Sequence, residues 1–308
     1  MSDSFDLVVI GGGPGGYSAA LYGASAGLKV AMVEKDALGG TCLNRGCIPA
    51  KAFLETAAVK RHVEHAAEFG IDASPPSVNF AVTQARKQKI VAGLVGGIAA
   101  MCKGRKIEVF NGIGSLGAGR TVSIAQADQT ATITGDNVLL ATGSVPRLIP
   151  GFERGGPIMT SDEVLDLDYV PARVAVIGGG AIGCEFASTF ADLGAQVTIL
   201  EFLPKILPGL DADVANVVVR SFKKKKIDIR TGVKVSGHTP NGSGATTVQF
   251  GEGESVEVDA CIVSVGRRPY ADQLGLAGTG VKVSDRGFVE VDEYCRTGES
   301  GVYAIGDL

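Results

Sequence analysis

Hydrophobic and polar residues alternate with glycine breaks in a pattern that occurs twice along the chain. Residues 5–10 (FDLVVI) form a short apolar run, GGGPGG interrupts it at 11–16, and 17–28 (YSAALYGASAGL) is rich in alanine and other small residues. A second apolar run, KVAMVEK, follows at 29–35. This order predicts a strand, a glycine turn, a helix packed closely on a sheet and a second strand.

The same order returns at 173–202, with the sequence RVAVIGGGAIGCEFASTFADLGAQVTILEF. In both copies the last glycine of the turn precedes a glutamate by 18 residues, Gly16 before Glu34 and Gly183 before Glu201. Because the repeated stretch contains a complete strand, turn, helix and strand, the sequence predicts two nucleotide-binding α/β units.

The first glycine turn has the chemistry expected of a dinucleotide site. Gly11 allows a tight turn, Gly13 admits a pyrophosphate to the backbone, and Gly16 lets helix and strand pack closely. N–H groups at the helix N-terminus attract phosphate. Glu34, at the end of the next strand, is expected to accept hydrogen bonds from an adenosine ribose.

The second turn, Gly178, Gly180 and Gly183 with Glu201, follows the same logic and also indicates the coenzyme. A carboxylate at the end of this strand favours the 2′-hydroxyl of NAD and repels the 2′-phosphate of NADP. The residues after Glu201, FLPK, contain one lysine and no arginine cluster that would bind a phosphate. The second unit is therefore predicted to bind NAD.

Two of the six cysteines, Cys42 and Cys47, stand close together in GGTCLNRGCIPAK at 39–51. A tetrahedral zinc site needs four ligands, usually from two close pairs, and the chain has no second pair, so no metal is expected. Pro49 suits the first turn of a helix, which would place Cys47 at a helix N-terminus where the dipole and Lys51 stabilise a thiolate. A redox pair therefore fits better than a metal site. The scattered cysteines are expected to be buried and inert: Cys102, Cys184, Cys261 and Cys295.

Several charged residues leave alternatives open. Arg45, in the expected loop between the two cysteines, either adds positive field or faces water. Without a family to compare with, Lys51 and Glu185 are equally consistent with solvated helix positions. The run KKKK at 223–226 is typical of a solvated helix end.

Charge and hydropathy exclude several classes of function. The 308 residues carry a net charge of −4 with a pI of about 5.5, which argues against a nucleic-acid partner. There is no apolar run of about 18 residues that would span a membrane, and the acidic start MSDSFD lacks the basic region of a secretory signal. We expect a protein of the cytoplasm, or of an organelle matrix if a transit peptide has been removed.

Two dinucleotide units and a thiol pair together predict an electron relay. A nicotinamide donates hydride but does not readily reduce a disulfide, whereas a flavin converts hydride into dithiol chemistry. The first unit is therefore expected to bind FAD and the second NAD.

The segment GGTCLNRGCIPAK resembles the redox-active segment of the pyridine nucleotide-disulfide oxidoreductases. Within the family it is most similar to the dihydrolipoamide dehydrogenases, since glutathione and mercuric reductases usually have valine at the positions of Leu43 and Ile48. GGGPGG, LLATGS, GGGAIGCEFAS, GRRP and YAIGD also appear in the family's order, so the resemblance covers essentially the whole chain. Tyr270 is a departure, because the family usually has asparagine after GRRP.

The resemblance implies an α/β fold with two Rossmann-like dinucleotide-binding domains. The FAD domain is expected to be discontinuous, at 1–148 and 271–308, with the NAD domain at 149–270 between its two parts. The implied FAD contacts are Gly11, Gly13, Gly16, Glu34, Gly40, Thr41, Thr142, Gly143 and Asp307. The implied NAD contacts are Gly178, Gly180, Gly183, Glu201 and Gly266.

The same resemblance implies catalytic roles for four residues. Cys47 is expected to lie against the flavin, and Cys42 to exchange with dihydrolipoamide. Lys51 is expected near the flavin N5 atom, paired with Glu185. The implied reaction is the oxidation of protein-bound dihydrolipoamide with reduction of NAD⁺. The alternatives are a sister glutathione or mercuric reductase, or a nucleotide-binding module without turnover.

The family continues past the GD motif at Asp307 with a dimer-forming interface domain, whose His–Glu pair acts as acid and base. No histidine follows His238 in this sequence. We therefore expect a C-terminally truncated chain that lacks the interface domain and is inactive alone. The full-length parent is expected to be a homodimer that serves a lipoyl-bearing acyltransferase of a 2-oxoacid dehydrogenase complex or the H-protein of glycine cleavage.

Overall fold

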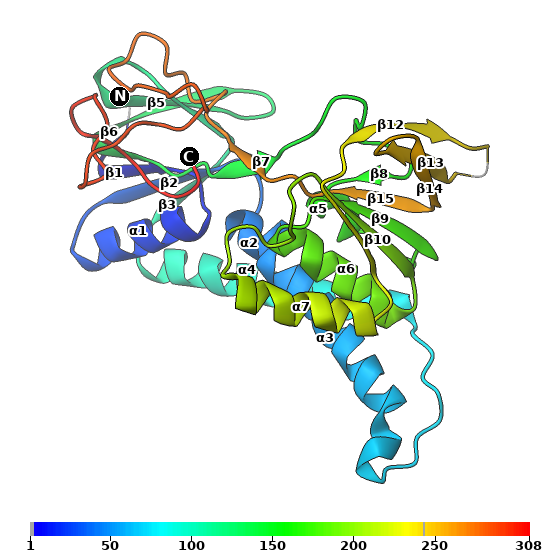
Figure 1. The fold of residues 1–308 in the computed structure, drawn as a ribbon. Coiled ribbons are helices and arrows are strands. Elements are labelled where there is room, and N and C mark those ends of the chain that lie inside the picture. Colours follow the sequence, from blue (N-terminus) through cyan, green and yellow to red (C-terminus); the bar gives the residue numbers. More distant parts are fainter. Residues whose placement is uncertain (1–2, 243) are drawn as a thin grey trace. The chain divides into compact units, whose positions relative to one another are not determined.

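The computed structural model describes residues 3–242 and 244–308 (Figure 1). Contacts within the chain divide it into two compact units. The first unit comprises Met1–Ile48, Ile90–Val145 and Arg267–Leu308, and the second comprises Pro49–Lys89 and Pro146–Gly266. Contacts thus group residues 49–89 with the second unit, whereas the sequence-based division, with boundaries at 148/149 and 270/271, assigned them to the first domain. The functional domain boundaries stay predictions.

The first unit is built on a seven-stranded sheet. Its path runs β3-β2-β1-β6-β5-β4, and β17 pairs with β6. The elements are β1 (Asp3–Ile10), α1 (Pro14–Ser25), β2 (Val30–Glu34), α2 (Gly40–Arg45), β3 (Glu108–Asn111), β4 (Ile113–Leu116), η2 (Ala118–Arg120), β5 (Thr121–Ala125), β6 (Thr130–Leu140), β7 (Ser144–Pro146), β16 (Arg267–Pro269) and β17 (Val302–Ala304).

The middle of this sheet is parallel because helices connect its first strands. β1 pairs in parallel with β2 on one side and with β6 on the other. All five residues of β2 are buried, as expected of a strand covered on both faces. β4, β5 and β6 form an antiparallel meander at the other side of the sheet. This confirms the predicted strand, glycine turn, helix and strand at the start of the chain.

The second unit contains a five-stranded parallel sheet and a separate three-stranded antiparallel sheet. The strand orders are β11-β10-β9-β15-β8 and β12-β13-β14. The elements are η1 (Ala66–Phe69), β8 (Ile158–Met159), α5 (Ser161–Val164), β9 (Arg173–Ile177), α6 (Ala181–Leu193), β10 (Gln196–Glu201), α7 (Ala212–Lys224), β11 (Asp228–Thr231), β12 (Val235–Pro240), β13 (Thr246–Phe250), β14 (Glu254–Val258) and β15 (Ala260–Val263).

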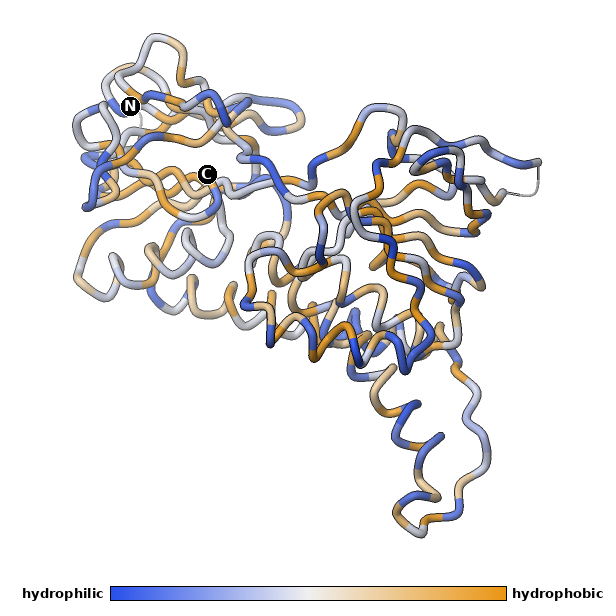
Figure 2. Tube along the Cα trace, viewed as in Figure 1, coloured by the Kyte–Doolittle hydropathy of each residue, from blue (hydrophilic) through white to orange (hydrophobic). Residues whose placement is uncertain are grey.

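The second repeat is thus β9, α6 and β10, the counterpart of β1, α1 and β2. Two long helices, α3 (Cys47–Glu64) and α4 (Phe80–Gly104), have residues in both units. Figure 2 shows hydrophobic residues concentrated along the strands of the seven-stranded and the five-stranded sheet, in agreement with the buried clusters on each. These observations confirm an α/β fold with two Rossmann-like units, and the chain enters the first unit again after the second.

The charged run at 223–226 lies at the end of α7 as predicted and is exposed except at Lys225, which is half-buried. Lys225, in the run predicted to be a solvated helix end, lies just after α7 and donates to Ser188 Oγ and Asp192 Oδ2, both at 2.7 Å. Asp192 is nearly buried and also pairs with Arg61 of α3. A buried carboxylate needs such partners, so the Lys225 side chain is held against α6 while its neighbours in the run remain exposed.

Within the described residues no helix is both long and apolar enough to cross a bilayer.

Candidate functional site

The two glycine turns have the same backbone geometry. Gly11 and Gly178 follow β1 and β9 with φ angles of 108° and 105°, in the left-handed region that favours glycine. A Cβ atom on Gly16 would overlap the carbonyl oxygen of Gly11, and one on Gly183 would overlap that of Gly178. Each helix can therefore start directly against its strand only with glycine at these positions. Gly13 and Gly180 are the N-caps of α1 and α6.

The glutamate at the end of each second strand is buried and bonded back to its own turn. Glu34 Oε2 accepts the N–H of Gly12 at 2.7 Å, and Oε1 accepts that of Asp36 at 2.9 Å. Glu201 repeats this arrangement with Gly179 at 2.5 Å and Leu203 at 2.7 Å. Each carboxylate oxygen has a second lone pair, so both glutamates retain the capacity to accept ribose hydroxyls.

Gly12 and Gly179 are residues that the sequence reasoning missed. A Cβ on Gly12 would lie 3.1 Å from Glu34 Oε2 and 2.9 Å from Leu38, and one on Gly179 would lie 3.2 Å from Glu201 Oε2. The middle glycine of each turn therefore keeps room for the glutamate. The signal was present in the sequence, because GGG occurs in both repeats although the motif requires only its first and third glycines.

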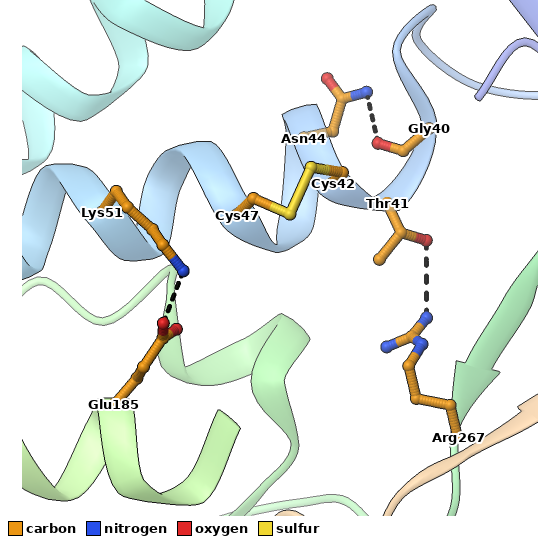
Figure 3. Close-up of a disulfide and its surroundings, with 8 residues drawn as sticks. All are labelled: Gly40, Thr41, Cys42, Asn44, Cys47, Lys51, Glu185 and Arg267. Carbon is orange, nitrogen blue, oxygen red and sulfur yellow. Dashed lines mark hydrogen bonds and ion pairs between the residues drawn. A yellow bond between two sulfur atoms is a disulfide. The ribbon is translucent and has the colours of Figure 1, made fainter. Parts of the chain in front are cut away.

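Cys42 and Cys47 form a disulfide with a Cα–Cα distance of 4.7 Å (Figure 3). Cys47 is the first residue of α3, as predicted from Pro49. Cys42 lies in α2, so the segment expected to be a loop is a short helix. The Asn44 side-chain amide supports it by donating to three carbonyls, among them that of Gly40 at 3.0 Å. Cys47 is exposed and Cys42 half-buried.

The disulfide segment packs directly on the first glycine turn. A Cβ on Gly40, the first residue of α2, would lie 2.5 Å from the Cα of Gly13. Gly39 donates its N–H to the carbonyl of Gly12 at 2.8 Å. The fold thus brings the thiol pair, two residues after Gly40, beside the predicted phosphate-binding turn. Arg45, which was expected either to add positive field or to face water, pairs with Asp36 and remains about half-exposed.

Lys51 lies one helical turn after Cys47 and makes an ion pair with Glu185 of α6, Nζ to Oε1 at 2.6 Å (Figure 3). The expected pairing of these two residues is therefore present. The helix dipole favours an anion at the N-terminal end of α3, where Cys47 lies, whereas the charge of Lys51 is offset by its pair with Glu185.

A polar network joins three of the predicted FAD-contacting segments. Arg267 donates to Ser144 Oγ at 2.8 Å and to the Ser144 carbonyl at 2.6 Å, and its Nη2 lies 3.5 Å from Thr41 Oγ1. Ser144 Oγ in turn donates to Asp307 Oδ2 at 3.3 Å. Arg267 lies within the range predicted for the NAD domain, 149–270, yet contacts group it with the first unit. Gly266, the preceding residue, belongs to the second.

A pocket opens at the carboxyl ends of β1 and β2, where α/β sheets bind ligands. Its lining includes Glu34 and Thr142. The remaining lining residues are Ile10, Gly11, Val33, Lys35, Gly112, Ile113, Gly114, Tyr270, Gln273 and Leu274. The glycine turn, the buried carboxylate and this apolar pocket fit the adenosine diphosphate half of a dinucleotide, so the residues present are suited to FAD.

The other cysteines mostly match their expected role. Cys102, Cys184 and Cys261 are buried, whereas Cys295 is half-buried, contrary to expectation. Burial, with the carboxylates of Glu201 and Glu185, raises the pKa of Cys184 to about 12. Burial alone raises the pKa of Cys261 to about 12. These two thiols therefore stay protonated near neutral pH and are poor nucleophiles.

Comparison with known proteins agrees with this geometry. The family model described as pyridine nucleotide-disulphide oxidoreductase matches residues 5–308. The dihydrolipoyl dehydrogenase of Geobacillus stearothermophilus is 39% identical over 98% of the chain, and the chain spans 65% of that protein. That of Chlorobaculum parvum is 41% identical, with 100% of this chain and 66% of that protein matched.

Solved structures of other proteins share the fold. LpdA from Mycobacterium tuberculosis has a TM-score of 0.92 at 28% identity, covering 99% of this chain and 67% of its own. The Cu(II) complex of the HOCl-induced flavoprotein disulfide reductase RclA from Escherichia coli has a TM-score of 0.89 at 28% identity, covering 100% of this chain and 66% of its own. The matched family spans nearly the whole sequence, so the chain belongs to the pyridine nucleotide-disulphide oxidoreductases.

Proposed function

We propose that this chain is the part of an NAD-linked dihydrolipoyl dehydrogenase that binds FAD and NAD and carries the exchanging disulfide. The observation that carries the proposal is the Cys42–Cys47 disulfide, which packs on one of two dinucleotide turns and has Cys47 at the start of α3. FAD, when bound, passes an electron pair between a dithiol and a nicotinamide.

The thiol chemistry follows from the positions of the two sulfurs. A thiolate of dihydrolipoamide attacks Cys42 Sγ, and the S–S bond breaks with Cys47 leaving as a thiolate. Position in α3 supports this direction, because the N-terminus of the helix stabilises negative charge on Cys47. The second substrate thiol then attacks the mixed disulfide, which releases lipoamide and Cys42.

The two electrons now reside in the Cys42–Cys47 dithiol. FAD, when bound beside this pair, would supply the two-electron carrier that links the dithiol to NAD⁺, so that the disulfide can form again. The net reaction converts dihydrolipoamide and NAD⁺ to lipoamide, NADH and one proton. Glu201 supports NAD as the acceptor, since its buried carboxylate disfavours a 2′-phosphate at the same place.

The predicted site residues take roles in this proposal according to their positions. Glu34, Gly40, Thr41 and Asp307, with the first glycine turn and the Thr142–Gly143 segment, hold FAD. The second glycine turn, Glu201 and Gly266 hold NAD. The physiological partners would be a lipoyl-bearing acyltransferase or H-protein, and the working enzyme a homodimer in the cytoplasm. This protein spans about 65% of its relatives' length, and the relatives' names support the substrate class.

Anaerobic alkylation after treatment with dihydrolipoamide tests the first step. We expect Cys42 and Cys47 to become labelled, as read by peptide mass spectrometry, and labelling to be lost again when FAD and NAD⁺ are present. Cys295→Ser is the matched control and should change neither result. No labelling of either cysteine by dihydrolipoamide, while dithiothreitol labels both, would contradict the proposal.

A sister disulfide reductase is the second candidate, supported by the fold shared with RclA. It predicts that NADH or NADPH reduces Cys42–Cys47 in the FAD-loaded protein and that glutathione disulfide or Hg²⁺ reoxidises the pair. Rates measured in parallel with lipoamide, glutathione disulfide and Hg²⁺ separate the two candidates. A preference for lipoamide supports the dihydrolipoyl dehydrogenase.

A further inference from the structure

Tyr270, the residue that departs from the family pattern, is fixed in place on the wall of the first unit's pocket. Its backbone N–H donates to the Gly143 carbonyl at 2.8 Å, and Thr142 Oγ1 donates to its carbonyl at 2.7 Å. Its hydroxyl donates to Gln273 Oε1 at 2.6 Å. Three hydrogen bonds therefore determine where the ring lies, and two of them come from the Thr142–Gly143 segment.

The ring of Tyr270 holds a lysine that would otherwise extend into water. Lys35 Nζ lies 3.7 Å from the ring centroid, a cation–π contact. Lys35 directly follows Glu34, and both line the pocket together with Tyr270. The exposed Lys35 ammonium group is thereby kept next to a site that is predicted to receive a dinucleotide.

The lining suits one chemical class of ligand. Aliphatic side chains of Ile10, Val33, Ile113 and Leu274 offer apolar walls to a flat heteroaromatic base. Glu34 offers carboxylate oxygens to ribose hydroxyls, while the Lys35 ammonium group adds positive charge favourable to a phosphate. Since Gln273 Oε1 accepts from Tyr270, its amide N–H groups are available as donors to ring nitrogens.

We propose that Tyr270 sets the affinity for the adenosine half of FAD, both as a wall of this pocket and by positioning Lys35 through the cation–π contact. The inference rests on the proposed function, which assigns the first unit to FAD. It adds a positioning residue contributed by the segment after β16, far in sequence from the glycine turn and Glu34.

The experiment measures binding to the FAD-free protein. Calorimetry with ADP probes the adenosine half alone, fluorescence titration with FAD probes the whole cofactor, and FMN, which lacks adenosine, is the counter-probe. We expect Tyr270→Ala to weaken ADP and FAD binding about tenfold and Tyr270→Phe to stay within about threefold of the wild type. Binding of FMN should not change.

Two further variants make the test specific. Lys35→Ala should weaken ADP binding about threefold to fivefold in the wild type, and this loss should vanish in the Tyr270→Ala background, because the ring positions the lysine. Tyr294→Ala is the matched control, since Tyr294 is an exposed residue of the same unit with Arg296 at 4.9 Å from its ring centroid. It should bind ADP like the wild type.

The outcomes separate the inference from the function on which it rests. A wild-type protein that binds neither FAD nor ADP would overturn the proposed function. The inference alone would be overturned if Tyr270→Ala binds FAD with unchanged affinity, or if Tyr294→Ala loses as much ADP affinity as Tyr270→Ala. It would also be overturned if the losses of ADP affinity caused by Tyr270→Ala and Lys35→Ala are strictly additive. Circular dichroism melting of each FAD-free variant verifies the fold, and Lys35→Ala, at an exposed position, keeps the test decisive if Tyr270→Ala misfolds.

Discussion

Glu201 accepts the backbone N–H of Gly179 through Oε2 at 2.5 Å, so the acid at the end of β10 binds the turn that follows β9. The same bond joins Glu34 and Gly12 at 2.7 Å in the first unit. A residue expected to contact only ligand therefore also holds the glycine turn in shape. Loss of the carboxylate should affect both the fold and the ligand.

Glu201→Gln is expected to lower both stability and NAD affinity. Glutamine keeps one acceptor oxygen but places an NH₂ group toward one of the two backbone donors, leaving it unsatisfied at a cost of about 1–3 kcal/mol. Urea unfolding followed by circular dichroism and NADH titration by fluorescence measure the two effects. Glu254→Gln, at an exposed carboxylate of the same unit, is the control. Equal stability and NADH affinity in Glu201→Gln and wild type would contradict the double role.

Gly183→Ala is expected to disrupt the second turn. Its Cβ would overlap the carbonyl oxygen of Gly178, so β9 and α6 must separate, which costs stability and NADH binding. Gly97→Ala is the matched control, because Gly97 lies inside α4 and a Cβ there would enter open space. The control should be more stable by about 0.5–1 kcal/mol through helix propensity. Thermal melting and fluorescence titration distinguish the two, and a Gly183→Ala protein with normal values would refute the argument.

The buried thiols give a pH-dependent prediction. The unfolded thiol of Cys261 ionises near its ordinary pKa of 9.0, whereas burial raises the folded pKa to about 12. The folded state therefore retains its proton longer, and the stabilising contribution is complete below pH 9 and is lost as pH rises toward 12. The stability difference between wild type and Cys261→Ala should shrink over this range, as measured by urea unfolding. A difference that stays constant or grows would be inconsistent with the buried neutral thiol.

Alkylation of the folded protein tests the burial of the free cysteines directly. In the oxidised, folded protein, iodoacetamide should label Cys295 and leave Cys102, Cys184 and Cys261 unlabelled, because burial raises their pKa values and blocks access. Denaturation in urea should make all four reactive. Rapid labelling of Cys184 in the native state would show that the second turn opens to solvent.

Asp192→Ala is expected to destabilise the second unit by about 2–3 kcal/mol. The substitution removes the carboxylate that pairs with Arg61 and Lys225. The Lys225 side chain is only 17% exposed, so its ammonium group is left without the countercharge of Asp192 and keeps only its hydrogen bond to the Ser188 hydroxyl. Asp36→Ala is the control, since its pair with Arg45 is about half-exposed on both sides and contributes about 1 kcal/mol or less. Denaturant unfolding measures both. A smaller effect for Asp192→Ala than for Asp36→Ala would contradict the role of burial.

The repeated unit was predictable because its signals are local. Strand periodicity, the glycine turn and the terminal glutamate all lie within about one supersecondary unit, and a turn of this kind requires glycine for steric reasons visible in the sequence. Position of Cys47 at the start of a helix followed from Pro49 by the same local logic. The binding roles of these residues stay predictions that the experiments above address.

Contacts between distant segments could not be read from local patterns. Arg267 reaches Ser144 across 123 residues and Thr41 across 226, and Tyr270 reaches Thr142 across 128. No periodicity encodes such pairs, because sheet order and crossovers decide which segments meet. The helical form of Gly40–Arg45 was missed for a related reason, since a six-residue helix is stabilised by packing and side-chain bonds and not by propensity.

The paired strands β7 and β16 have a consequence for how this molecule can be rebuilt. Arg147 donates its N–H to the Gly266 carbonyl at 3.0 Å, so the chain leaves and returns at one place. Residues 147–266 are topologically a cassette whose two ends a short artificial turn could close. Removing residues 147–266 would, however, expose Ala50, Phe53 and Ala57 of α3 to water, because these residues pack in the same hydrophobic core as residues of the removed segment. A viable miniature flavin carrier would therefore need those three positions recoded with polar residues.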